Sequence, residues 1–336
     1  LTMNTGTAVE ERIVAMQRFP APERLVRIIT KSGLEVIATP DHEVAVDRFR
    51  KTEVLHGGTW VRAHEIQVGD RVFALKQFVL DASRPEMVDL LPDDFRLADA
   101  ALVAEVKERL QAKHGSLAAV WRDLGVKPSD PRVNSLPLGL FKRALADLGE
   151  TWDGAKGSVK TVLCNVTHLD LPPLNEDLFY LLGLLSADGS FQRQGRHQCT
   201  INFVNTSPEL LAAFTETYQH LFPGQPIGMV RHDSTAPTLG GRTIQATRPC
   251  YRLYLNNPLL GVLAESFGVK MDGAEHWNLG RMVRLPEGLI AAFLAGNFDG
   301  DGSARVRQSD GRWETGEVYL CVADRQAAGH LQLLLK

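Results

Sequence analysis

The sequence is poor in the features that mark disulfide-linked, zinc-binding and membrane proteins. It has four cysteines in 336 residues, and none belongs to a CxxC pair, which excludes the usual zinc spacing and a disulfide framework. No apolar run approaches the roughly 20 residues that a membrane-spanning helix needs. The opening stretch, LTMNTGTAVEER, lacks the basic and apolar regions of a signal peptide. We therefore expect a cytoplasmic protein without a membrane partner.

An excess of charge of either sign is also missing. The chain has 37 Lys and Arg against 40 Asp and Glu, which argues against a uniformly basic nucleic-acid binder and leaves local basic patches open. Its length predicts two or three domains. Composition divides it into a strand-rich segment (1–80), a linker with a helical insert (81–175) and a segment that mixes helices and strands (176–336).

Two stretches of the third segment share one pattern. LLGLLSADGS covers residues 181–190 and FLAGNFDGDGS covers residues 293–303. Each predicts an apolar helix that requires burial on every side and ends in Asp-Gly-Ser. Small residues recur four apart within each stretch, so one face of each helix would let the two backbones approach closely. Parallel packing would bring Asp188 and Asp301 together at one end of the pair.

The elements around these helices repeat as well. The sequence predicts an α+β fold with an internal repeat of about 113 residues, measured from Asp188 to Asp301, whose second copy is incomplete. The first copy comprises helices at 178–187, 207–222 and 258–268 and strands at 190–197, 199–206, 226–232 and 249–256. The second comprises a helix at 289–298, two strands around an Asp310-Gly311 turn, and a helix from Gln326.

Paired carboxylates at one end of the helix seam indicate a metal site. Two adjacent carboxylates repel each other unless a cation lies between them. Mg²⁺ prefers oxygen ligands and phosphate-rich sites, and a bound metal can activate water for phosphodiester hydrolysis. A calcium loop is a weaker interpretation, because DGDGSARVRQSD has Ala304 and Asp310 where an EF-hand has glycine and glutamate. An Asp-Gly turn with no ligand is the interpretation that either stretch alone would favour.

The two nonamers, LLGLLSADG and LAGNFDGDG, resemble those of the LAGLIDADG (DOD-type) homing endonucleases, and the order of helices and strands over 176–336 resembles that family as well. The resemblance implies a double-strand DNA endonuclease that acts as a monomer with pseudo-two-fold symmetry. It implies that Asp188 and Asp301 bind Mg²⁺ and are catalytic. The chain departs from the pattern at Ser186, where the family name has Asp. It also has VRLP at 283–286, where members inside inteins often have Lys-x-Ile-Pro, and whether Arg284 substitutes for that lysine is open.

Arginine and amide side chains are concentrated on the strands expected to contact DNA. Arginine can read guanine, and glutamine or asparagine can read adenine, and strand alternation would place such residues on one face. A solvated sheet face is the competing interpretation. The candidate DNA-binding residues are Gln192, Arg193, Gln194, Arg196, Arg231, Arg242, Arg248, Arg252, Arg305 and Arg307, with Gln198 and Asn202 interleaved.

The insert is predicted to contain short helices separated by turns. A helix over 98–115 is followed by a second with Ser116 as N-cap and Gly125 as its end, and SLPLGLFKRALADLGE predicts a third. Eight Lys or Arg and four acids lie within residues 105–145. A helix-turn-helix DNA-binding unit and a helical insert without a ligand are equally compatible with this pattern.

The first segment resembles the N-terminal part of the Hint (hedgehog/intein) fold. TPDHEV at 39–44 resembles the Thr-x-x-His block of inteins, and the segments on either side resemble intein sequence. The resemblance implies that His42, assisted by Thr39, polarises the scissile amide during the first acyl shift of protein splicing. No Cys or Ser opens the chain and no His-Asn pair closes it, so we expect an internal portion of a longer intein-bearing precursor.

Two functions of different class follow from these patterns. The leading hypothesis is a site-specific endonuclease nested in an intein, with Mg²⁺ as cofactor and double-stranded DNA as substrate. The alternative is a DNA-binding module on the same fold that has lost cleavage, or a regulator or RNA maturase. The absent lysine favours the alternative modestly.

Overall fold

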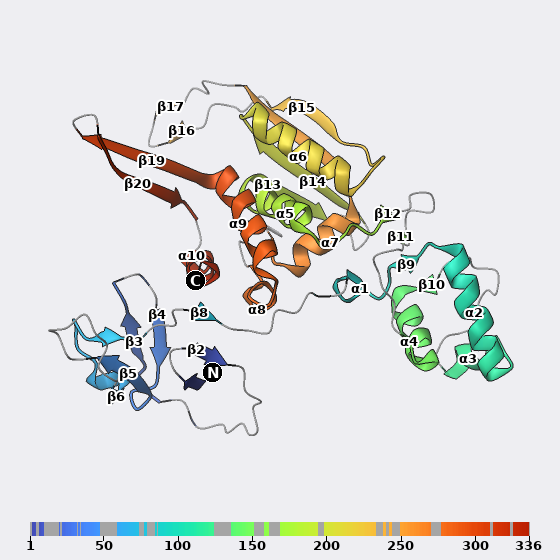
Figure 1. Ribbon diagram of the computed structural model, residues 1–336, viewed down its shortest axis with the longest axis horizontal. Coiled ribbons are helices and arrows are strands. Elements are labelled where there is room, and N and C mark those ends of the chain that lie inside the picture. The colour runs from blue at the N-terminus through green and yellow to red at the C-terminus, as the bar shows by residue number, and fades with distance from the viewer. Residues whose placement is uncertain are drawn as a thin grey trace. The chain divides into compact units, whose positions relative to one another are not determined.

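The structure, a computed structural model, separates into two compact units, which are described one at a time (Figure 1). One unit comprises residues 1–81 and 328–336, and the other comprises residues 82–327. The residues that the structure describes are 2–4, 7–9, 20, 22–31, 33, 35–47, 59–73, 77–78, 85, 87–123, 136–150, 158–160, 169–193, 198–232, 238–239, 242–243, 249–269, 277–309, 312–322 and 325–335.

The first unit is built from short strands, as its alternating β-branched residues predict. A hairpin pairs β3 with β4, and Gly33 in its turn has a φ of 83°, which glycine adopts readily. A second sheet has the order β6-β5-β7, and a third has the order β1-β2-β8. The elements are β1 Thr2–Asn4, β2 Thr7–Val9, β3 Val26–Ile29, β4 Glu35–Ala38, β5 Glu43–Asp47, β6 Thr59–Arg62, the 3₁₀ turn Ala63–Glu65, β7 Arg71–Val72 and β8 Gln77–Phe78.

The second unit begins with the helical insert, which also contains a small sheet. Asp99 caps α2 by accepting hydrogen bonds from two backbone N–H groups, and Gly115, at a φ of 72°, ends it. The predicted helices are present, and Gly125 lies outside the described residues. The elements are α1 Met87–Leu90, β9 Arg96–Leu97, α2 Ala100–His114, α3 Leu117–Asp123, β10 Leu136–Pro137, α4 Leu138–Leu148, β11 Ser158–Lys160 and β12 Leu169–Asp170.

A four-stranded antiparallel sheet follows, with the order β13-β14-β18-β15. One face packs on helices: the rings of Phe203 on β14 and Phe214 on α6 stack 4.5 Å apart. Cys199 lies against Gly261 of α7, where a side chain would clash with its sulfur. The elements are β13 Gly189–Arg193, β14 Cys199–Asn205, α6 Pro208–Leu221, β15 Gly228–His232, β16 Thr238–Leu239, β17 Arg242–Thr243, β18 Cys250–Asn256 and α7 Pro258–Ser266.

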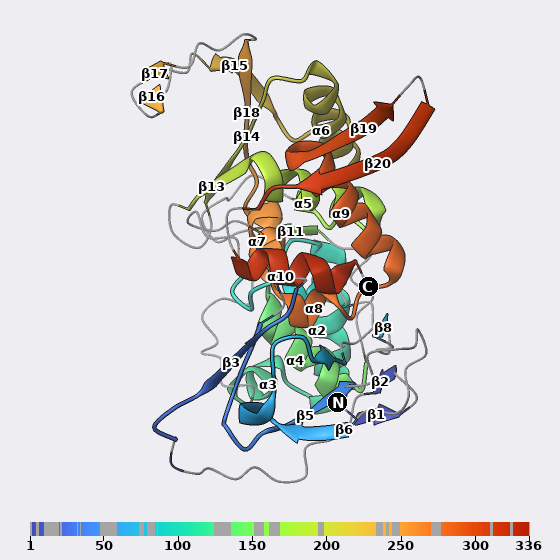
Figure 2. The same cartoon turned by 90° about the vertical axis from the view of Figure 1, so that its left-hand side faces the viewer.

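Two helices that are distant in sequence form the centre of this unit, α5 Glu176–Asp188 and α9 Glu287–Asp301. Figure 2 shows them side by side, with the β19–β20 hairpin leaving the end of α9. The remaining elements are α8 Leu279–Met282, β19 Gly302–Ser309, β20 Arg312–Leu320 and α10 Arg325–Leu334, of which residues 328–334 belong to the first unit. The predicted Asp310-Gly311 turn lies outside the described residues.

The chain therefore has the mixed α+β architecture that the sequence predicts, and the predicted helices and strands of the third segment are present. One expectation was wrong. Helix α5 is buried almost throughout, but α9 exposes Ala291 and Ala295. Alanine has little apolar surface, so a stripe of alanines can face water at small cost. Within the described ranges, no helix has the length and apolarity to cross a membrane.

Candidate functional site

The contact between α5 and α9 depends on glycine. A Cβ added to Gly183 would lie 2.1 Å from the carbonyl oxygen of Phe293, and one added to Gly296 would lie 2.2 Å from the carbonyl oxygen of Tyr180. Real Cβ atoms do not approach other atoms so closely, so only glycine permits this backbone separation. Further along, a Cβ on Gly300 would meet Ala187 at 2.3 Å. The residue numbers of the contacting positions increase in the same direction along both helices, so α5 and α9 are parallel.

Parallel packing brings the two acid-bearing ends to the same place. Asp188 is the last residue of α5, and Asp301 is the last residue of α9. A Cβ on Gly300 would lie 3.3 Å from a carboxylate oxygen of Asp188, so this carboxylate lies against the residue that precedes Asp301. The C-terminal end of a helix also carries partial negative charge. Two helix ends and two carboxylates therefore converge where a cation would be attracted.

The carboxylate of Asp188 is held by an amide from the neighbouring sheet. Asn205, the last residue of β14, donates a hydrogen bond from Nδ2 to Oδ2 of Asp188 over 2.7 Å. Its Oδ1 accepts from the backbone N–H of Ser207, the N-cap of α6. Sequence analysis missed Asn205, because a lone asparagine near a strand end normally indicates only a turn or cap.

The sixth position of each nonamer accepts a hydrogen bond from an aromatic side chain. Ser186 is buried, and its hydroxyl accepts from the indole N–H of Trp277 over 2.9 Å. Asp299 is exposed and accepts from the hydroxyl of Tyr180 over 2.8 Å. Burial raises the pKa of Tyr180 to about 12, and the hydrogen bond to Asp299 contributes to the rise. The departure at Ser186 is thus accommodated by a buried polar contact on the side of α5.

The donor set at the seam fits a hard divalent cation that keeps part of its hydration. Carboxylate oxygens are the ligands that Mg²⁺ prefers, and it commonly binds one or two protein carboxylates together with waters and phosphate oxygens. Within the described ranges, no group of three His, Cys, Asp or Glu residues is arranged to enclose a metal. Asp188 and Asp301 could therefore hold Mg²⁺ only in an open site completed by water or substrate.

The sheet presents one polar face away from its helices. Its pairing places Gln192 opposite Thr200 and Thr200 opposite Asn256, while Asn202 lies opposite Tyr254. These residues alternate with the helix-facing Phe191, Ile201 and Leu255, so they share the open face. Gln192 and Asn256 are exposed, and the Tyr254 side chain is 48% exposed. This open face offers hydrogen-bonding groups with little charge.

The expectation that the arginines and amides share one face was wrong for two residues. Arg193 follows Gln192 directly, so it points to the opposite face, where its guanidinium pairs with Glu265 at the end of α7. Arg231 lies opposite Tyr251 and also belongs to the helix-facing row. Arg252 lies opposite Val204 and Val230, on the open face with Gln192. Adjacent residues of a strand always alternate, so charge content alone did not define the face.

Other candidate DNA-binding residues occupy the second hairpin or lie outside the described residues. Arg305 on β19 is exposed, and its guanidinium lies 5.7 Å from the ring centre of Tyr319, a cation–π contact. Counted from the acids, Arg305 is four residues beyond Asp301, as Gln192 is beyond Asp188. Arg242 lies in β17 and Arg307 in β19. Gln194, Arg196 and Arg248 are outside the described residues.

Arg284 is far from the acidic end of the seam. It lies in the turn before α9, whereas Asp301 is the last residue of that helix. A helix of 15 residues is about 22 Å long. An arginine side chain spans much less than this length, so the Arg284 guanidinium does not reach the Asp301 carboxylate.

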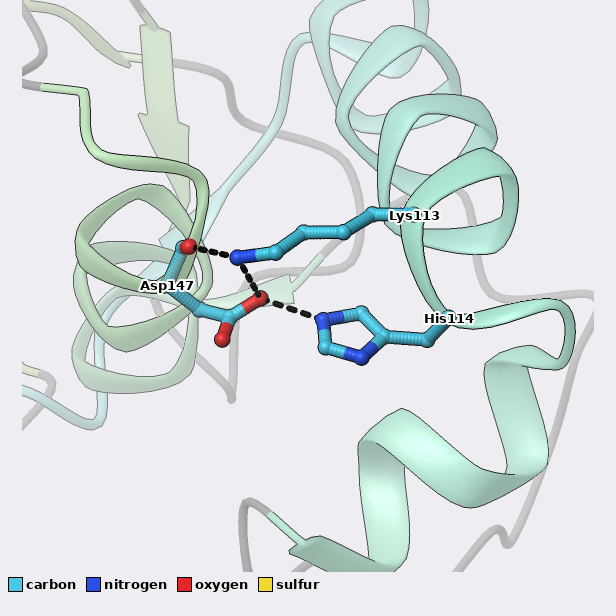
Figure 3. A network of polar contacts seen from close by, with 3 residues as sticks. All are labelled: Lys113, His114 and Asp147. Atoms are coloured by element: carbon cyan, nitrogen blue, oxygen red, sulfur yellow. Dashed lines mark hydrogen bonds and ion pairs between the residues drawn. The ribbon is translucent and has the colours of Figure 1, made fainter.

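Three basic residues at the end of α2 link it to the end of α4. Asp147 on α4 accepts from Lys113 and from His114, whose ring nitrogen lies 2.6 Å from the carboxylate (Figure 3). These two partners hold the pKa of Asp147 below its usual range, with the His114 contact the larger cause. Arg109 pairs with Glu150, again linking α2 to the end of α4. Part of the positive charge that suggested DNA binding is thus neutralised within the insert.

In the first unit, the two residues that the intein resemblance singles out lie in one turn. The backbone N–H of His42 donates to the carbonyl oxygen of Thr39 over 3.1 Å, and the His42 side chain is exposed. The Thr39 hydroxyl hydrogen-bonds the carboxylate of Asp41, which lowers the pKa of that group. The carbonyl oxygen of His42 accepts from the N–H of Ala63, which ties the turn to the end of β6.

Comparison with known proteins gives two relatives, and no family model matches the chain. The chain is 27% identical over 337 residues to a subunit of the A-type ATP synthase of Methanopyrus kandleri, an alignment that covers 98% of this chain and 30% of that protein. It is 26% identical over 204 residues to elongation factor 2 of the same organism, covering 55% of this chain and 15% of that protein. The chain therefore spans less than a third of either relative's length.

Proposed function

We propose that residues 176–336 form a LAGLIDADG-type, site-specific endonuclease that cuts double-stranded DNA, and that the whole chain is part of an intein. The observation that carries the proposal is the glycine seam, in which Gly183 and Gly296 let α5 and α9 run in parallel and bring Asp188 against the residue before Asp301. A purely structural helix pair has no need for carboxylates at both converging ends, where they repel each other.

In this function the chain's own residues bind and orient the substrate. When bound, Mg²⁺ lowers the pKa of a water molecule and stabilises the oxygen that leaves phosphorus. The Asp188 and Asp301 carboxylates would hold the cation at the helix ends, and the open sheet face contacts bases through the exposed Gln192. Asn202 shares this face but is only 9% exposed. Water adds to phosphorus, one phosphorus–oxygen ester bond breaks, and the leaving oxygen takes up a proton. The pseudo-two-fold pair of acids gives one such centre for each strand.

The two relatives support the intein part of the proposal. An ATP synthase subunit and an elongation factor differ in function by their names, yet each contains a segment similar to this chain. An insertion that occupies unrelated host proteins produces this pattern. A shared nucleotide-binding domain is a poorer account, because the chain contains no GxxxxGK[ST] phosphate-binding loop.

The first unit is then the N-terminal part of the splicing domain. Its short strands and the turn that holds Thr39 and His42 support this role, with His42 exposed for contact with a scissile amide. Expression of the uninterrupted precursor, with His42→Ala as the comparison, tests it. We expect a spliced product from the parent and strongly reduced splicing from the variant; equal splicing by both would remove His42 from the reaction.

The endonuclease is tested with plasmids that carry randomised inserts. Incubation with Mg²⁺ should linearise a subset of plasmids, and sequencing of their ends should return one site. Asp188→Asn and Asp301→Asn should each lower double-strand cleavage on the order of a thousandfold, because each removes one metal ligand. Asp299→Asn is the matched control, since it changes an acid of the same nonamer and keeps an acceptor for Tyr180. Unchanged cleavage by Asp188→Asn would overturn the assignment.

The VRLP run at 283–286, which lacks the lysine that members inside inteins often have there, favours a second candidate, a DNA-binding module that does not cut. A non-cutting module would select one DNA sequence in a binding assay and leave it intact with Mg²⁺ or Mn²⁺. The same plasmid selection, scored for retained and for linearised DNA, separates the two candidates.

A further inference from the structure

The two β-hairpins that follow the acid-bearing helices have the same register. Gln192 and Arg305 each lie in the third pair beyond the glycine that follows the acid. The equivalent pairs are Gly189 with Phe203 and Gln192 with Thr200 in β13–β14, and Gly302 with Leu320 and Arg305 with Glu317 in β19–β20. Four residues of strand span about 13 Å, so Gln192 and Arg305 lie at a similar distance from their acids.

The seam relates these two positions by approximate two-fold symmetry. Gly183 lies against the carbonyl oxygen of Phe293, and Gly296 lies against that of Tyr180. Each carbonyl belongs to the residue three before the glycine of its own helix, so the contacts are reciprocal. Reciprocal contacts between two parallel helices define a two-fold axis along the seam. Equivalent positions of the two hairpins are therefore expected at equal distances from that axis.

Gln192 and Arg305 also belong to equivalent rows of their hairpins. Gln192 alternates with the helix-facing Phe191 and is exposed on the open face of the sheet. Arg305 alternates with Ala304, which pairs with Val318, and Arg305 is exposed as well. Side chains alternate along a strand and the two registers match, so the row of Arg305 corresponds to the open face that carries Gln192.

The second hairpin supports the Arg305 side chain from one side. The guanidinium lies over the ring of Tyr319, 5.7 Å from the ring centre. The Tyr319 hydroxyl donates to the Glu317 carboxylate, which restrains the ring next to Arg305. A cation–π contact engages the charge of the guanidinium and leaves its N–H donors available to an acceptor. Arg305 therefore presents a planar set of donors from a supported position.

We propose that Arg305 and Gln192 are specificity-determining residues that read bases at mirrored positions of the two half-sites, guanine by Arg305 and adenine by Gln192. Arginine donates two hydrogen bonds to O6 and N7 of guanine, whereas the glutamine amide donates to N7 and accepts from N6 of adenine. The inference rests on the proposed endonuclease function and specifies its substrate, a DNA site that is not palindromic at this pair of positions.

Selection of DNA by the full chain tests the assignment. Randomised duplexes that the wild-type protein retains are sequenced, and the midpoint of the two cuts in linearised plasmids gives the centre of the site. We expect guanine in one half-site and adenine in the other, at equal distances from this centre. Each base should be preferred on the order of tenfold or more over the other bases.

Exchange of the two side chains should exchange the two bases. Arg305→Gln should replace the selected guanine with adenine, and Gln192→Arg should replace the selected adenine with guanine. Each single variant then selects a site that is symmetric at these two positions. The double variant should select the wild-type bases exchanged between the half-sites. A misfolded protein cannot acquire a new preference, so the double variant distinguishes altered base reading from loss of structure.

The support of Arg305 by Tyr319 is tested with a pair of variants. Tyr319→Phe keeps the ring and should keep the guanine preference. Tyr319→Leu removes the ring and should lower the guanine preference by about two- to fivefold, with the adenine preference at the mirrored position unchanged. A guanine preference that survives Tyr319→Leu undiminished would contradict this support.

Arg193→Gln is the matched control. It makes the same chemical change next to Gln192, in a side chain that pairs with Glu265 on the opposite face. It should leave both selected bases unchanged. If Arg305→Gln weakens binding equally to all sequences, Arg305 contacts a phosphate, and the inference fails while the endonuclease stands. Selected bases that no exchange alters overturn it as well. If the wild type selects no sequence, the inference and the proposed function fail together.

Discussion

Helices α5 and α9 present the same nine-residue frame to each other and different surroundings to the rest of the unit. Both place a glycine at the third position, where Gly183 and Gly296 lie against the backbone of the opposite helix. Their outer sides differ: α5 is enclosed by α6 and the sheet, whereas α9 exposes Ala291, Ala295 and Asp299. Close contact between the two backbones thus requires small residues at the same positions of both helices. On their outer sides, the residue types differ because α5 is covered by other elements and α9 is partly exposed to solvent.

Substitution of a seam glycine should have the largest effect. We expect Gly183→Ala to lower the free energy of unfolding of this unit by at least about 3 kcal/mol, because the added methyl would overlap the Phe293 carbonyl and force the helices apart. Urea unfolding followed by circular dichroism measures it.

A glycine in open space provides the control for that experiment. A Cβ on Gly280 of α8 would meet nothing nearer than an Asn278 side-chain oxygen at 3.7 Å. Gly280→Ala should therefore be neutral or stabilise by up to about 1 kcal/mol, since alanine is the better helix former. Equal losses from both substitutions would mean that helix propensity, rather than the seam, is being measured.

The sixth positions give the next largest effect, because one is buried and the other exposed. Trp277→Phe leaves the Ser186 hydroxyl without its donor in a buried site, and we expect a loss of about 2 kcal/mol. Ser186→Ala removes the acceptor instead. The double variant should lose less than the sum of the single ones, because the two side chains interact directly. Strict additivity in urea unfolding would contradict the contact.

The features that sequence predicted are those encoded locally. Apolar content, glycine position and caps such as Ser207 belong to single helices, so the helices, their strands and the parallel acid-bearing ends could be anticipated. The alternation of side chains along the strands could also be predicted. The expectation of a single shared face was wrong because Arg193 directly follows Gln192 and therefore points to the opposite face. Charge content alone did not distinguish the two faces of the strands.

The supporting contacts were beyond sequence, because their partners meet only in the folded chain. Trp277 and Ser186 are 91 residues apart, and Asn205 reaches Asp188 across the turn into β13 and β14. No local pattern distinguishes such an asparagine from an ordinary strand-end cap. In the insert, two of the basic residues that suggested DNA binding, Arg109 and Lys113, pair with Glu150 and Asp147 at the end of α4. Charge counts do not reveal such pairing.

Substitution at the fourth positions of the nonamers should have a smaller effect on the free energy of unfolding, and at Asn297 that effect should be stabilising. Leu184 in α5 is fully buried in an apolar position, whereas α9 has Asn297, which is 3% exposed and has an Oδ1 without a hydrogen-bond partner. A buried amide oxygen without a donor is unfavourable. We expect Asn297→Leu to raise the free energy of unfolding by about 1 kcal/mol and Leu184→Asn to lower it by more. Destabilisation by Asn297→Leu would reveal a partner for the amide.

The smallest effect concerns the hydrogen bond between Tyr180 and Asp299, the more exposed of the two contacts at the sixth positions. It should appear only at alkaline pH. Burial, with help from Asp299, raises the pKa of Tyr180 to about 12 from its ordinary value of 10. Between these values the unfolded chain releases the phenolic proton and the folded chain keeps it, so stability is present below pH 10 and is lost as pH rises toward 12. Tyr180→Phe should remove this part of the decline while leaving stability at neutral pH nearly unchanged. Trp277→Phe should leave the decline intact, because the indole does not titrate in this range. If the thermal melts of wild type and Tyr180→Phe fall in parallel across this window, the Tyr180 proton is not held by the fold, and the two sixth positions differ only in burial.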